Sequence, residues 1–138
     1  MRLLLLCLFA GLSVGALPVS HADALPPHVQ LNLSQQIDHA CDGIPDPEDG
    51  SIPGDCILYR IEVINTGQDI AYQVNVKSRI PEHTILKRPL ERLDGQEEVV
   101  DTLIEQNGGG VRFIKTLLRE LPPGEEHRVV LEYAVQIL

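Results

Sequence analysis

One short acidic stretch carries most of the side chains that could bind a ligand. Its carboxylates lie on Asp42, Asp46, Glu48, Asp49 and Asp55. Calcium takes oxygen ligands from acidic loops of this kind. The spacing from Asp46 to Gly50 differs from that of an EF-hand, and Pro47 stiffens the middle. We therefore expect either an ordinary solvated loop or a weak calcium site formed by Asp42, Asp46, Glu48 and Asp49.

Two cysteines enclose this stretch, and we predict that Cys41 and Cys56 form a disulfide. Cys7 lies in an expected export signal, so the mature chain keeps an even number of cysteines in an oxidising compartment. The bridge would stabilise the fold by about 3 kcal/mol in the chain-entropy model. The alternative is a metal site in which His39 and Asp42 join the cysteines, but their spacing does not match a structural zinc site.

The other titratable residues show no catalytic pattern. The histidines of the expected mature chain are dispersed and form no HxxxH or HExxH pair: His28, His39, His83 and His127. The expected mature chain has no Gly-x-Ser-x-Gly elbow, phosphate loop or dinucleotide fingerprint. We predict a protein that is not an enzyme and needs no cofactor, with calcium as the one candidate ion.

The charge of the chain is strongly negative. It carries 11 Lys and Arg against 20 Asp and Glu, a net charge of −9 at neutral pH. Nucleic acids and anionic lipid surfaces both require a basic surface, so neither is expected as a partner. The charge fits a cationic partner or divalent cations, or it only keeps an exported protein soluble.

The N-terminus is typical of an export signal. Arg2 forms a short positive region, and Leu3–Leu12 is an apolar run of the length expected for a signal peptide. We expect a signal peptide over residues 1–22, with cleavage after Ala22 or Ala24. No later segment is long and apolar enough to span a membrane. The mature chain, residues 25–138, suits a single domain.

Alternating apolar and polar residues predict four strands. The first has Val29, Leu31 and Leu33 on one buried face, and the second has Tyr59, Ile61 and Val63. The third covers Ala71–Ile80, with Tyr72, Val74, Val76 and Ile80 on one face. The last directs alternate residues inward, with Glu132 and Gln136 outward: Val129, Leu131, Tyr133, Val135 and Ile137.

Turns rich in proline and glycine separate these strands. They include the Cys41–Cys56 loop, Asn107–Gly110 and Leu121–Glu125. Val111–Leu118 is predicted to be a further strand. Residues 82–110 are ambiguous, because Val99, Val100, Leu103 and Ile104 fit a helix as well as short strands. The pattern predicts an all-β, immunoglobulin-like β-sandwich of about seven strands.

The order of turns and strands resembles that of a bacterial conserved-repeat family called domain of unknown function 11. That family consists of immunoglobulin-like modules of exported and cell-surface proteins. The resemblance extends from about Val29 to Ile137 and depends on these residues: Pro53, Gly54, Asp55, Tyr59, Ile61, Val63, Asn65, Thr66, Gly67, Ala71, Val74, Val76, Ile80, Pro81, Leu121, Pro123 and Gly124. Ser78 departs from it, since the family usually has Asp there.

Physical roles for these residues follow from their types. Gly54, Gly67 and Gly124 permit a positive φ at turns. Asn65 can bond its own backbone and so form the corner between two strands. Tyr59, Tyr72 and Tyr133 can each bury a ring while the hydroxyl keeps a hydrogen-bond partner. All these roles belong to the scaffold.

The sequence therefore predicts an exported, non-catalytic binding or structural module of the bacterial envelope, either periplasmic or at the cell surface. The expected partner is another envelope protein that pairs with an edge strand. Val129–Ile137 is the candidate edge, or else the strand that is supplied to the partner. The alternative is a calcium- or glycan-binding surface module that uses the acidic loop, residues 42–55.

Overall fold

The computed structural model describes residues 25–47, 49–93 and 103–138. The expected signal peptide, residues 1–22, lies outside the described residues, as do Glu48, Val99 and Val100. One short 3-10 helix, η1, covers Glu125–His127. The strands, in chain order, are β1 (Val29–Asp38), β2 (Cys56–Asn65), β3 (Ala71–Arg79), β4 (Thr84–Arg92), β5 (Leu103–Gln106), β6 (Arg112–Leu121) and β7 (Val129–Ile137).

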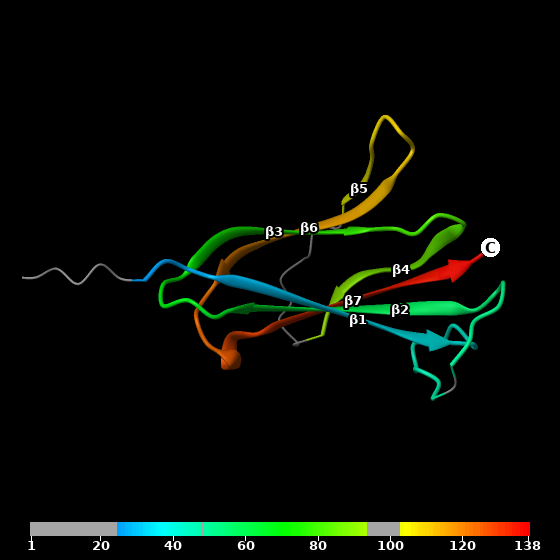
Figure 1. Cartoon of the computed structure of the whole chain (residues 1–138), viewed down its shortest axis with the longest axis horizontal. Helices are drawn as coiled ribbons and strands as arrows, with labels where there is room; N and C mark the ends of the chain where they lie inside the picture. Colours follow the sequence, from blue (N-terminus) through cyan, green and yellow to red (C-terminus); the bar gives the residue numbers. More distant parts are fainter. Residues whose placement is uncertain (1–24, 48, 94–102) are drawn as a thin grey trace, which may run out of the picture.

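The strands form two stacked antiparallel sheets (Figure 1). One sheet has the order β1-β2-β7-β4, and the other has the order β3-β6-β5. The all-β sandwich predicted from the sequence is confirmed. The division into four and three strands is that of a constant-type immunoglobulin domain. The connectivity differs, because β7 lies between β2 and β4, where the fifth strand lies in that domain.

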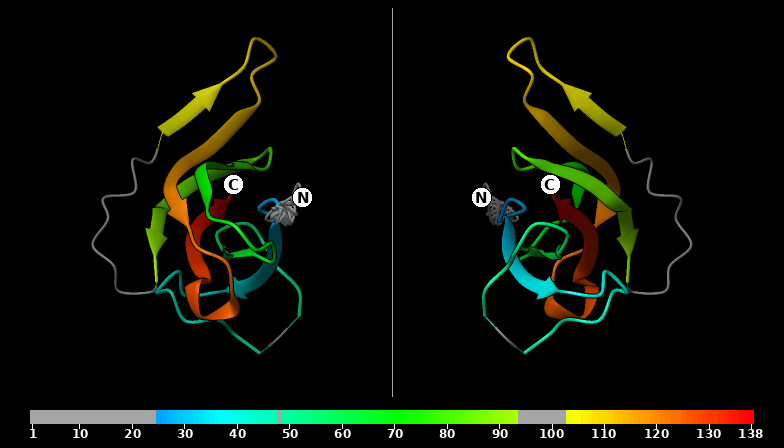
Figure 2. Two further views of the ribbon diagram at one scale, coloured as in Figure 1. Left: turned by 90° about the vertical axis from the view of Figure 1, so that its left-hand side faces the viewer. Right: turned by 90° about the vertical axis from the view of Figure 1, so that its right-hand side faces the viewer.

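The position of β7 corrects one prediction. Val129–Ile137 was expected to be an edge strand, but β7 pairs with β2 on one side and β4 on the other. The described edges are instead β1 and β4 in the four-stranded sheet, and β3 and β5 in the three-stranded sheet. The hairpin of β5 and β6 projects away from the four-stranded sheet (Figure 2).

The core lies between β2, β7 and the inner faces of β3 and β6. Val63, Leu131 and Leu121 are completely buried there. Tyr59 and Tyr133 stack with ring centroids 5.0 Å apart, and the Tyr133 hydroxyl shares a 2.7 Å hydrogen bond with Ser78 Oγ. Desolvation raises the pKa of both phenols. The inward faces predicted for β2 and β7 are thus confirmed, except that Ile137 is only partly buried.

The predicted burial of Tyr72 is wrong. Its side chain is 63 % exposed, whereas Val76 and Ile80 on the same predicted face are buried. The reason is Gln73, whose φ of 52° lies in the left-handed region and interrupts the alternation of the strand. Ala71 therefore points inward and Tyr72 outward, and the inward face resumes at Val74.

The buried face predicted for β1 is wrong at Leu31 and Leu33, whereas Val29 is partly buried and packs against the core. Leu31 and Leu33 pair with the buried Val63 and Ile61, so they lie on the inner face of the sheet. They are nevertheless 52 % and 61 % exposed. These exposures show that the three-stranded sheet leaves the inner face of β1 uncovered at Leu31 and Leu33. Alternation predicts which side chains share a face, but not whether another layer covers it.

Asn65 joins four segments at one end of the sandwich. Its side chain is fully buried, and its Oδ1 accepts hydrogen bonds from His28 N at 3.1 Å and Gly67 N at 3.0 Å. Its Nδ2 donates to Asp69 O at 2.7 Å and Leu121 O at 2.9 Å. The predicted corner is confirmed, and the amide also holds the start of β1 and the end of β6.

Gly67 is required for a reason other than the predicted one. Gly54 and Gly124 have φ of 99° and 109°, as expected for turn glycines, but Gly67 is not among the residues with positive φ. A Cβ at Gly67 would instead overlap the backbone of Pro26, Pro27 and His28. The glycine allows the leader to cross the turn between β2 and β3.

We expect Asn65→Ala to lower the free energy of unfolding by about 3 kcal/mol or more, because it leaves buried N–H and C=O groups without partners. Thr66→Ala is the matched control. Thr66 is exposed and its hydroxyl donates one bond, to His28 O at 3.2 Å, so we expect a loss below about 1 kcal/mol. Urea unfolding of the oxidised proteins measures both, and equal losses would contradict the role assigned to Asn65.

Candidate functional site

A disulfide closes the loop that follows β1. Cys41 and Cys56 are bonded, with their Cα atoms 5.1 Å apart, which confirms the prediction. Because both sulfur atoms are in the bridge, the alternative metal site with His39 and Asp42 is ruled out. The loop lies at the end of the sandwich opposite the Asn65 corner (Figure 1).

Asp38, the last residue of β1, starts the loop. Its side chain is buried, and its carboxylate accepts hydrogen bonds from Asp42 N at 3.2 Å and Gly43 N at 2.7 Å. These N–H groups belong to the turn that contains Cys41, which has a φ of 54°. Asp38 was not among the residues predicted to act in this loop. Its position next to His39, directly before a cysteine turn, was the available signal.

Asp55 holds the other end of the loop. Its Oδ2 accepts a hydrogen bond from Ile52 N at 2.8 Å and lies 2.9 Å from His39 Nδ1. The bond from Ile52 is the largest cause that lowers the pKa of Asp55, and His39 lowers it further against the opposing effect of desolvation. The Pro53-Gly54-Asp55 turn also pairs with the end of β7. Gly54 N donates a hydrogen bond to Ile137 O, and Ile137 N donates one to Asp55 O.

The other loop carboxylates are partly engaged within the loop. Asp42 Oδ1 accepts a bond from Ile44 N at 2.9 Å, and Asp46 Oδ2 accepts one from His39 N at 2.7 Å. In the described part of the chain, no three His, Cys, Asp or Glu side chains converge so that they could hold a metal ion. Glu48 is outside that part. The structure thus brings Asp46 and Asp49 to one pocket, but Asp42 is not among the residues that line it.

The free edge of β1 is the second feature near this loop. His28 O accepts a bond from Thr66 N, so the backbone of His28 faces β2. Ile37 O accepts a bond from Asp46 N in the loop, so the backbone of Ile37 faces away from β2. Backbone direction alternates along an antiparallel strand. Val29, Leu31, Leu33 and Gln35 therefore direct their N–H and C=O groups to the open side.

The other described edge strands have features that discourage pairing with an additional strand. β4 carries Pro89 and has register shifts at Leu86/Arg88 and Arg88/Glu91. β3 has Gln73 at positive φ and carries Lys77 and Arg79, while β5 is four residues long. β1 is ten residues long and carries no charge before Asp38. Among the described edges, β1 is thus the one best able to accept another strand.

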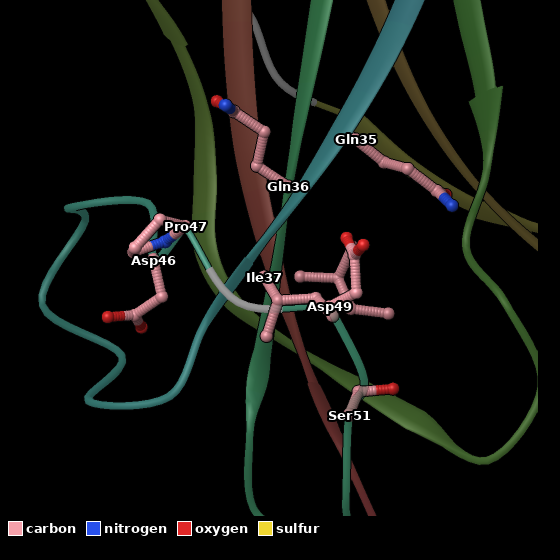
Figure 3. Close-up of a pocket in the computed structure, with 8 residues that line it drawn as sticks. Gln35, Gln36, Ile37, Asp46, Pro47, Asp49 and Ser51 are labelled. Carbon is pink, nitrogen blue, oxygen red and sulfur yellow. The ribbon is translucent and has the colours of Figure 1, made fainter.

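A pocket of about 460 Å³ lies where the free edge of β1 meets the loop (Figure 3). Gln35 and Gln36 project to opposite sides of the β1 ribbon, and Ile37 lies near Asp49. The described lining combines aliphatic residues with carboxylates, amides and a hydroxyl: Gln35, Gln36, Ile37, Asp46, Pro47, Asp49, Ser51 and Ile57. This lining suits an elongated side chain with a polar end. Among the described lining residues, no acid–base or nucleophile–base pair is formed.

The comparisons with known proteins found no match: neither a family model, nor a curated protein, nor a solved structure matches this chain. No helix among the described residues is long and apolar enough to cross a membrane.

We expect the acid stability of the protein to depend on Asp55. Its pKa lies below the ordinary value of 3.8, so the charged carboxylate stabilises the fold above about pH 4, and this contribution is lost as the pH falls through the lowered value. Asp55→Asn should therefore flatten the decline of unfolding free energy between about pH 5 and pH 2.5.

His39→Gln is the control for this titration. It keeps the Ile52 bond, which is the larger cause of the lowered pKa, so we expect it to retain part of the acid dependence. Urea unfolding across the pH range measures both variants. An identical pH dependence for the parent protein and Asp55→Asn would contradict the role of Asp55.

Calcium binding by Asp42, Asp46, Glu48 and Asp49 stays a prediction from the sequence. Hydrogen bonds to Asp42 and Asp46 occupy lone pairs that a cation needs, so binding should be no tighter than the millimolar range. Calorimetry at millimolar calcium measures it. The absence of heat would remove the hypothesis, and micromolar affinity would show that the loop rearranges.

Proposed function

We propose that the protein is an exported, non-catalytic binding module of the bacterial envelope. Its free β1 edge takes up an extended segment of another envelope protein as an additional strand. The observation that carries this proposal is the long uncharged edge, which has two exposed leucines and, at alternate residues, backbone groups that face away from β2 and pair with no other described strand. Main-chain pairing of this kind supplies affinity, and side-chain contacts supply specificity.

The two exposed leucines support strand addition because of the face on which they lie. Leu31 and Leu33 continue the inner surface formed by Val63 and Ile61. An added strand would place its own inward side chains beside them and would extend the core past β1. Burial of apolar area of this kind contributes roughly 25 cal/mol per Å². An edge strand left uncovered in this way exposes its protein to aggregation, which favours the presence of a partner.

The disulfide supports the proposed location. A bridge that closes a loop beside the binding edge is stable in the periplasm or outside the cell, and rare in the cytosol. The export signal proposed for residues 1–22 leads to the same compartments. The resemblance to the conserved-repeat family, also drawn from the sequence, agrees with a surface or envelope module.

We expect Leu33→Pro to abolish strand addition while leaving the fold intact. Proline is tolerated on an edge strand where the N–H faces solvent, and here it removes a donor needed by the incoming strand. A photo-reactive residue at Asn32 should crosslink one envelope protein in intact cells. The same residue at Ile85, 41 % exposed on β4 at the opposite border, should not. Leu33→Pro should reduce the Asn32 crosslink about tenfold.

Leu33→Val is the matched control, because it keeps both the N–H and an apolar side chain, and its crosslink yield should not change. Circular dichroism and thermal unfolding verify that the proline variant is folded, and Leu31→Pro provides an independent variant at an equivalent position. A crosslink that survives both proline substitutions in folded protein would contradict strand addition at β1.

A further inference from the structure

The loop closes one end of the free edge. Asp46 N donates a 2.8 Å hydrogen bond to Ile37 O, which is the bond that an added strand would otherwise make there. The disulfide and the bonds to Asp38 and Asp55 hold the loop in this position. An added segment can therefore pair with β1 from Val29 to Gln35, but it must end or turn at the pocket.

The pocket next to this end has the shape and chemistry for one long side chain. Ile37, Ile57 and Pro47 form aliphatic walls, and Asp46 and Asp49 are the acidic residues of the lining. The Asp49 carboxylate lies on the Gln35 side of β1, whereas the Asp46 carboxylate points away from it and accepts the bond from His39 N (Figure 3). None of the described residues that line the pocket is basic. Lysine and arginine bury their alkyl stems against apolar surface while the charged group stays at a polar boundary, where it can pair with carboxylates.

We infer that this pocket binds a lysine or arginine of the added segment. The inference depends on the proposed function and specifies its partner: an extended segment with apolar residues at alternate positions and a basic residue beside Gln35. The apolar residues would lie along Leu31 and Leu33. The cation would lie beside Asp49, which is on the same side of β1 as Gln35 in Figure 3. The net charge of −9 favours the approach of a basic segment.

A second copy of this chain fits the same edge less well. Antiparallel pairing of two β1 strands would match their uncharged residues, but β1 contains no lysine or arginine to enter the pocket. Its one charged residue, Asp38, is acidic and buried. Charge complementarity therefore favours a different, basic segment over self-association.

Two matched peptides test this inference. The first is Lys-Thr-Val-Thr-Val-Thr-Lys, with blocked termini. Its lysines and valines share one face, so a lysine can reach the pocket in either strand direction. The second has Glu in place of both lysines. Each is titrated into isotope-labelled, disulfide-bonded protein, and amide chemical shifts are followed by NMR.

We expect the lysine peptide to shift the amides of Leu31, Leu33, Asp49 and Ser51, and to bind at least about tenfold more tightly than the glutamate peptide. The double variant Asp46→Asn, Asp49→Asn should bring the two affinities within about threefold of each other. The preference should also weaken as salt rises from ~20 to ~300 mM.

Other outcomes separate the pocket from the edge. Equal affinities with shifts along β1 would overturn the basic side-chain site and leave the edge proposal standing. Shifts that spare β1, or no binding of either peptide, would overturn both. Shifts along β1 that depend on protein concentration without peptide, and that Leu33→Pro removes, would show that the occupant is a second copy and would overturn the inference.

Discussion

The buried amide of Asn65 is the interaction on which the rest of the structure depends. Both polar atoms of the side chain make two hydrogen bonds, which use its full capacity. Its backbone C=O accepts a further bond from Gly124 N. One residue thus positions the leader before β1, the corner between β2 and β3, and the turn between β6 and β7. The register of β1 on β2 begins at this corner, with Val29 opposite Asn65.

A second network at the opposite end completes the positioning of β1. Asp38 and Asp55 are carboxylates with little exposure, and each accepts backbone N–H groups of the loop. Together with the disulfide they place Asp46 against Ile37. The edge strand is therefore held at both ends, while the backbone between them keeps its outward groups open. This combination of fixed ends and an open middle is what makes β1 a suitable template for an added strand.

Local features were predictable from the sequence, and non-local ones were not. The strands β2 and β7, the disulfide and the glycine turns at Gly54 and Gly124 follow from alternation, cysteine number and turn chemistry. The place of β7 between β2 and β4 depends on pairing across the whole chain, which alternation does not encode.

The burial of Tyr72 was predicted wrongly because glutamine is not a residue type that indicates a positive φ, and Gln73 has one. In the acidic loop, which was predicted as a candidate calcium site, the carboxylates of Asp42 and Asp46 accept backbone N–H bonds from Ile44 and His39. The uncharged run before Asp38 was the overlooked signal for an open edge.

Residue-resolved amide hydrogen exchange along β1 would test whether this edge is open, because it reports which backbone N–H groups lack a hydrogen-bond partner. We expect rapid exchange at Leu31, Leu33 and Gln35, and slow exchange at Asn32, Ser34 and Gln36, which pair with β2. Slow exchange at all six residues in the isolated protein would show that the edge is already covered. That result would contradict the proposal that β1 is open to a partner.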